Sequence, residues 1–87
     1  MGIVYILKSL VNGRYYIGST NDLERRLFEH NNGKTKSTRF TRPYNLVFKQ
    51  VYGSVLEARI VERKLKNFKS RIIIEKIIDE GFISLGP

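Results

Sequence analysis

The sequence predicts an α+β fold of the α/β-sandwich type, in which a small three-stranded antiparallel sheet packs against about three helices. Apolar, β-branched and aromatic runs at about 3–8 and 14–19 flank Asn12-Gly13, the strongest short-range signal for a β-hairpin. Residues 44–52 form a third alternating run, and three other segments carry apolar residues at helical spacing. The resulting order, β-β-α-β-α-α, favours one sheet with helices against it.

The predicted hairpin brings two tyrosines onto one face of the sheet. With a two-residue turn, Tyr16 lies opposite Ser9, and Gly18 lies opposite Leu7. Tyr5, Tyr16 and Gly18 then share a face, and the glycine leaves space for another group to lie against the sheet. In this register the tyrosines are four strand steps, about 13 Å, apart. A bulge or a strong twist would have to bring them together.

The first helix is expected to begin at Asn21 and to end before Gly33. Asn21 and Glu24 form a pattern like a capping box, in which the first side chain caps the helix. Arg26 and His30 are four residues apart, so they project from the same helix face. We expect both at the edge of the buried surface.

The segment 33–43 has no apolar period and predicts an exposed loop before the third strand. Between His30 and Leu56 the chain has five basic residues and no acidic one. This run predicts a surface that contacts phosphates. The candidate nucleic-acid-binding residues of the loop are Lys34, Lys36, Arg39 and Arg42.

The second helix begins with Ser54-x-x-Glu57, another capping box, and its apolar residues follow helical spacing. At about 100° per residue, Glu62 falls inside the apolar arc of this helix. A lone carboxylate on a buried face requires a partner. Arg59 and Lys66 are the candidates on the same helix.

The third helix is expected over 70–80, where isoleucines recur at helical spacing before Gly81. An isoleucine-rich run is also compatible with a strand. Leu56 and Ile60 point away from the main apolar stripe of the second helix. A third helix packed over them would explain their position.

Composition limits the classes of protein. A chain of 87 residues is too short for two hydrophobic cores, so we expect one domain, 1–87. The absence of cysteine excludes disulfides and thiolate metal sites. The N-terminus lacks a secretion-signal pattern and no apolar run approaches the roughly 20 residues that span a bilayer. We therefore expect a cytoplasmic protein with no membrane partner.

The net charge indicates a polyanionic partner. Sixteen Lys and Arg residues against eight Asp and Glu residues give a formal charge of +8. So strong a positive potential on a small body attracts nucleic acid, although a basic surface kept for solubility would have the same composition.

The hairpin and helix motifs together resemble the GIY-YIG nuclease superfamily. The triplets Val-Tyr-Ile at 4–6 and Tyr-Ile-Gly at 16–18 match the two triplets of the family name, with Val4 in place of glycine. The resemblance then continues through 18–26, His30, 41–44, 57–58 and 62–66, and so covers most of the chain. More narrowly, the chain is similar to small standalone members related to the catalytic domain of the excinuclease C subunit.

The resemblance implies a metal-dependent nuclease that hydrolyses DNA phosphodiester bonds in one displacement, without a covalent intermediate. It implies that Tyr5 takes a proton from water, while His30, with its unperturbed pKa near 6.5, is the alternative base. The Arg26 guanidinium suits a phosphate, and the hard oxygen ligand Glu62 suits one Mg²⁺ or Mn²⁺ ion. The catalytic set is Tyr5, Tyr16, Arg26, His30 and Glu62, with Gly18 as a structural member of the site and Glu62 as the metal ligand.

Each of these residues also has a structural interpretation. The tyrosines are compatible with ordinary strand aromatics, and Arg26 and Glu62 with simple ion pairs, to Asp22 and on the Glu62 helix respectively. His30 is compatible with a residue at a helix C-terminus that the helix dipole favours, and Gly18 with simple close packing. The rival function is a non-catalytic module that retains the fold and binds DNA or RNA. In either case we expect salt-sensitive binding with little base discrimination, and a protein partner could supply specificity. No small-molecule cofactor is expected.

Overall fold

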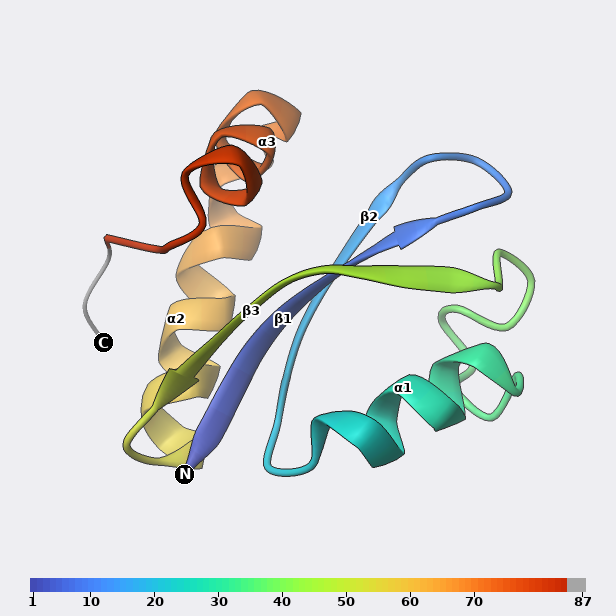
Figure 1. Ribbon diagram of the computed structural model, residues 1–87, viewed down its shortest axis with the longest axis horizontal. Helices are drawn as coiled ribbons and strands as arrows, with labels where there is room; N and C mark the ends of the chain where they lie inside the picture. The colour runs from blue at the N-terminus through green and yellow to red at the C-terminus, as the bar shows by residue number, and fades with distance from the viewer. Residues whose placement is uncertain (85–87) are drawn as a thin grey trace.

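The computed structural model describes residues 1–84 and confirms the predicted order of elements (Figure 1). The three strands pair antiparallel in the order β2-β1-β3, so β1 is central and β2 is an edge. None of the described helices is long and apolar enough to cross a membrane. The elements are β1 (Gly2–Ser9), β2 (Tyr15–Thr20), α1 (Leu23–Asn31), β3 (Tyr44–Tyr52), α2 (Val55–Phe68) and α3 (Arg71–Glu80).

The two faces of the sheet carry different cores. Figure 1 shows α1 on one side of the sheet and α2 with α3 on the other. Val4 and Ile6 of β1 pack with α2 and α3 in the larger cluster, while Tyr5 and Leu7 pack on the α1 side. Because β1 is buried on both faces, its side chains link the two cores.

The hairpin register differs from the predicted one by two residues. Tyr5 pairs with Gly18, and Leu7 pairs with Tyr16. The connection covers residues 10–14 rather than two residues, and the predicted pairs Leu7–Gly18 and Ser9–Tyr16 are wrong. A shift of two residues leaves every side chain on its predicted face.

Side chains of the connection explain its length. The Ser9 hydroxyl accepts hydrogen bonds from the backbone N–H groups of Val11 and Asn12, at 3.1 and 3.2 Å. The Asn12 side chain in turn accepts from the Arg14 N–H at 2.9 Å. Gly13 has φ 73, the left-handed conformation that glycine tolerates. Asn12 and Gly13 thus shape a longer loop than a minimal turn.

Hydrogen bonds at the helix starts correct one predicted cap and confirm the other. Asp22, not Asn21, caps α1, because its carboxylate accepts from the Arg25 N–H at 3.1 Å. Ser54 caps α2 as predicted. Ser70 caps α3, whose helical conformation excludes the strand alternative over 71–80.

The third helix does not cover Leu56 and Ile60, which are 67% and 38% exposed. Instead, Ile74 and Ile77 of α3 pack into the same core as Leu65. The predicted packing on the outer face of α2 is therefore wrong, and α3 extends the core beside the sheet.

Candidate active site

The side chain of Tyr5, on β1, lies over the edge strand β2 at Gly18. A methyl group on Gly18 would overlap the hydroxyl and the ring of Tyr5. The space predicted at the glycine is taken by the Tyr5 ring itself, so Gly18 permits close packing. The missing side chain therefore lets the phenol reach across β2.

The Tyr5 hydroxyl joins a buried chain of hydrogen bonds. It lies 3.0 Å from Nε2 of His30, whose Nδ1 lies 2.8 Å from the Thr38 hydroxyl. Thr38 donates to the Thr35 carbonyl at 3.5 Å, so it accepts from Nδ1–H of His30. The remaining lone pair on Nε2 then accepts the Tyr5 proton. Tyr5 is 1% exposed, and His30 and Thr38 are 0% exposed.

The electrostatics of the pair agree with this arrangement. Burial, assisted by the positive charge of Arg26, lowers the pKa of His30 to about 4, against the ordinary value assumed from the sequence. The imidazole is therefore neutral at pH 7. Burial also raises the pKa of Tyr5, and the Arg26 guanidinium opposes that rise.

Tyr16 completes an aromatic cluster with Tyr5 and His30. Its ring centroid lies 4.9 Å from that of His30, edge to face, and 6.4 Å from that of Tyr5. The corrected register, in which Tyr16 pairs with Leu7, places it two strand positions from Tyr5 rather than four. Tyr16 is half-buried and lies nearer the surface than Tyr5.

Arg26 lies at the edge of the buried surface, as its helix spacing predicted, with its side chain 28% exposed, whereas His30, which was expected at the same edge, is fully buried. It pairs with Glu29 at 2.9 Å, and not with Asp22, so that structural interpretation is wrong. Its charge acts on both Tyr5 and His30. A cation thus lies beside the aromatic cluster.

Glu62 approaches the site from the other side of the sheet, around the β2 edge. The Ser19 hydroxyl donates to its carboxylate, and the Lys66 ammonium lies 2.5 Å away. The side chain is 16% exposed. Its negative charge is close enough to contribute to the raised pKa of Tyr5. The partner expected for this carboxylate is therefore Lys66 together with Ser19, not Arg59.

The described residues 1–84 contain no group of three or more His, Asp or Glu side chains that could together hold a metal ion. Glu62 is the only carboxylate that acts on Tyr5 among the groups that shift its pKa. A metal site here would consist of one protein ligand, completed by water and substrate oxygens.

The basic loop is exposed, as predicted, and its cations contact aromatic rings. The Lys34 ammonium lies 5.6 Å from the Phe28 ring centroid, and the Arg39 guanidinium 4.9 Å from that of Phe40. Phe40 is 82% exposed. The exposed cations of the loop are Lys34, Lys36, Arg39 and Arg42.

Sequence reasoning missed Thr38, Ser19 and Lys66 as members of the site. Thr38 gave no signal because its loop lacks periodicity. Ser19 directly follows Gly18, and its position beside the motif glycine on an edge strand was the available clue. Lys66 was considered only as an ion-pair partner, which it is.

The class of this protein is defined by its site residues. They are two motif tyrosines on a hairpin, an arginine and a histidine on one helix, and a glutamate on the next long helix. The sequence profile of the GIY-YIG catalytic domain matches residues 1–76, and the chain belongs to this family. Among individual proteins, its relatives are UPF0213 proteins.

One relative, from Staphylococcus saprophyticus, is 38% identical over 79 residues, which are 90% of this chain and 94% of the relative. Another, from Streptococcus pneumoniae, is 43% identical over 79 residues, which are 90% of this chain and 78% of the relative. The solution NMR structure of a UPF0213 protein from Bacillus halodurans is similar with a TM-score of 0.57 and 36% identity. That match covers 91% of this chain and 84% of the other.

Proposed function

We propose that this GIY-YIG domain is a metal-dependent endonuclease that hydrolyses DNA phosphodiester bonds and either selects its target by structure or acts in DNA repair or processing. The observation that supports this most is the convergence of groups on one phenol. Tyr5 is hydrogen-bonded to His30, and Tyr16, Arg26 and Glu62 each act on its pKa. Perturbed, mutually interacting groups of this kind are typical of catalytic sites.

In the proposed reaction, the Tyr5 oxygen takes a proton from water while its own proton passes to Nε2 of His30. The resulting hydroxide forms the new P–O bond, and the bond to the leaving oxygen breaks in the same displacement. A phenol whose pKa is raised cannot act as a base alone, so the neutral His30 is required as the proton acceptor. Tyr5 is almost fully buried, and the substrate complex must admit water beside it.

Arg26 would stabilise the charge that develops on the phosphate. Its guanidinium retains its proton at any working pH and lies beside the aromatic cluster. In the free protein it is held by Glu29, a contact that leaves other N–H groups for a phosphate. Loss of one such electrostatic contact slows a reaction by about 100- to 1,000-fold.

Glu62 would hold the Mg²⁺ or Mn²⁺ ion, with waters and substrate oxygens as its other ligands. The donor set fits a weakly held hard cation, because one carboxylate with open solvent on part of its surface is the minimum that such an ion uses. When bound, the ion supplies positive charge to the phosphate and the leaving oxygen. The carboxylate would have to exchange the Lys66 ammonium for the metal.

The basic loop would bind the DNA backbone on the side of α1. Its four cations are exposed and free of ion pairs to acidic side chains within residues 1–84. Contacts of this kind hold the substrate without reading its sequence. Specificity would then come from DNA structure or from a protein partner.

A non-catalytic nucleic-acid-binding module is the second candidate, and the Glu62–Lys66 ion pair favours it. Lys66 occupies the carboxylate that a metal would need. A protein that only binds would use this pair for stability. It would be insensitive to loss of Glu62 and sensitive to loss of Lys34, Lys36, Arg39 and Arg42.

Cleavage of labelled linear, nicked, branched and single-stranded DNA, with Mg²⁺, with Mn²⁺ and with EDTA, tests the proposal. The wild type is compared with Arg26→Ala and Glu62→Ala, and with Glu80→Ala as a control that removes an exposed carboxylate from the end of α3. Metal-dependent cutting that is lost in the first two folded variants supports the nuclease. Absence of cutting, with DNA binding unchanged in Glu62→Ala, supports the binding module.

A further inference from the structure

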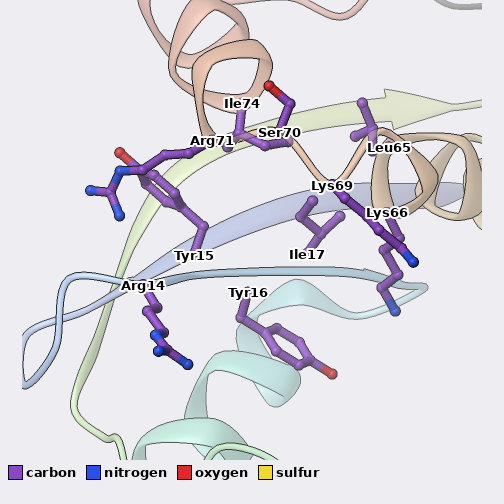
Figure 2. A pocket seen from close by; sticks show the side chains of 10 residues that line it. All are labelled: Arg14, Tyr15, Tyr16, Ile17, Leu65, Lys66, Lys69, Ser70, Arg71 and Ile74. Atoms are coloured by element: carbon purple, nitrogen blue, oxygen red, sulfur yellow. The ribbon is translucent and has the colours of Figure 1, made fainter.

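A cleft of about 450 Å³ lies between the outer edge of β2 and the junction of α2 with α3 (Figure 2). Ile17 of β2, Leu65 of α2 and Ile74 of α3 line its apolar part. The proposed reaction does not use these residues. The cleft is large enough for a nucleotide-sized ligand.

Positive charge lines both ends of this cleft. Figure 2 shows Arg71 toward one end and Lys66 and Lys69 toward the other, with Ile17 between them, while the Arg14 side chain leaves β2 at the Arg71 end on the face opposite Ile17. Lys66 and Arg71 are paired with glutamates, whereas Arg14 and Lys69 have no ion pair within residues 1–84. An apolar surface between cations matches a base flanked by two phosphates.

The conformation of Lys69 is a second, independent observation. Lys69 ends α2 with φ 49 and ψ 36, in the left-handed conformation where glycine is preferred. The corresponding position at the end of α3 is Gly81. In Figure 2 the Lys69 side chain extends toward the same end of the cleft as that of Lys66. Such outliers concentrate at functional sites.

The cleft shares two of its lining residues with the candidate active site. Tyr16 lines the cleft and also packs on His30. Lys66 lines it and also pairs with Glu62. A strand whose phosphate lies at the active site would therefore enter the cleft with its neighbouring nucleotide.

We propose that the cleft binds an unpaired nucleotide adjacent to the scissile phosphate, so that the substrate is DNA with a single-stranded segment. This proposal rests on the proposed nuclease function and specifies its substrate. The base lies on Ile17, Leu65 and Ile74, and its flanking phosphates contact the cations. A base in intact duplex is paired and stacked, and it reaches such a surface only by leaving the helix.

Binding is measured in EDTA, so that it is independent of cleavage. The probes are fluorescent oligothymidylate and a duplex of equal length, followed by anisotropy at two salt concentrations. The test variant is Arg14→Ala combined with Lys69→Gly, and glycine suits the left-handed position, so the fold is retained. Lys76→Ala combined with Arg63→Ala is the control, because it removes two exposed cations outside the cleft.

The cleft variant is expected to bind oligothymidylate about tenfold more weakly than the control variant, with duplex binding changed by less than about threefold. Equal losses on the two DNA forms would indicate general charge attraction and overturn the proposal. If the cleft variant bound oligothymidylate as tightly as the control variant does, the proposal would also be overturned. Competition by free thymidine monophosphate as strong as that by the oligonucleotide would assign the cleft to a mononucleotide instead.

The failure of the nuclease and the failure of the cleft give different results. If the wild type cuts no DNA but the single-strand preference disappears in the cleft variant, the cleft is a single-strand site on a protein that is not a nuclease. If the wild type cuts DNA and the cleft variant keeps the same preference for single strands, the nuclease proposal stands and the cleft proposal is wrong.

Discussion

The Tyr5 hydroxyl and Nε2 of His30 lie 3.0 Å apart in the interior of the protein, on elements that are 25 residues apart in the sequence. Neither group is charged at pH 7, because burial raises the pKa of the first and lowers that of the second. A neutral imidazole at this distance has a free lone pair to accept the phenol proton, which a protonated imidazole would lack.

Replacing Tyr5 with phenylalanine removes the hydroxyl and retains the ring. We expect the single-turnover rate of DNA cleavage to fall by about 100-fold or more, the usual contribution of a general base, with thermal unfolding little changed. Tyr16→Phe serves as the matched comparison on the same cluster, and a smaller loss is expected. The opposite order of effects would assign the proton transfer to Tyr16.

His30 should make stability depend on pH. Its folded pKa of about 4 lies below the unfolded value of 6.5, so the unfolded chain binds a proton that the folded protein does not. The contribution of the neutral His30 ring to the free energy of unfolding is complete above pH 6.5 and is lost as the pH falls toward 4. It amounts to at most roughly 3 kcal/mol.

Urea unfolding at pH 7 and pH 5 checks this dependence. The variant His30→Gln lacks the titrating ring and should lose less stability than wild type between these pH values. Carboxylates titrate in both proteins, so the difference between the two is the informative quantity. Parallel curves would show that His30 does not titrate differently on folding.

Gly18→Ala should displace the Tyr5 ring. The added methyl group overlaps the phenol, and overpacking of this kind costs about 1–3 kcal/mol. Cleavage should fall along with stability. At Gly53 an added methyl group meets the Glu57 carboxylate at an ordinary 3.6 Å, so Gly53→Ala should change stability by less than about 0.5 kcal/mol. Equal unfolding free energies for the two variants would contradict the close packing at Gly18.

Lys66→Met should ease metal binding. The Lys66 ammonium competes with a cation for the Glu62 carboxylate, and methionine retains the apolar stem without the charge. We expect half-maximal cleavage at a lower Mg²⁺ concentration than in wild type. The comparison is Lys76→Met, which removes a distant exposed lysine. An increased Mg²⁺ requirement in Lys66→Met would indicate that Lys66 supports catalysis directly.

Local patterns predicted the elements well because each is encoded within a few neighbouring residues. Alternation over 44–52 gave the bounds of β3, the Ser54 cap gave the start of α2, and isoleucine spacing gave the extent of α3. The start of α1 was placed one residue early, because Asn21 and Asp22 are both good capping residues and only the backbone conformation selects between them.

Long-range packing could not be predicted in this way. The hairpin register depends on hydrogen bonds from Ser9 and Asn12 that lengthen the connection. Helical spacing identified Leu56 and Ile60 as a separate face but carried no information about what covers it. The site was predictable in its motif residues and not in Thr38, whose role exists only because its loop folds under α1.

The basic loop both presents cations to solvent and, through Thr38, supports His30. Its outer side presents cations, while its inner side supplies the hydroxyl that orients the imidazole of His30. The segment thus supports His30 of the candidate site on one side and is exposed to solvent on the other. Grafting the loop of another family member to change DNA preference would also reset the orientation of the histidine, and such chimaeras should keep the threonine and its spacing from His30.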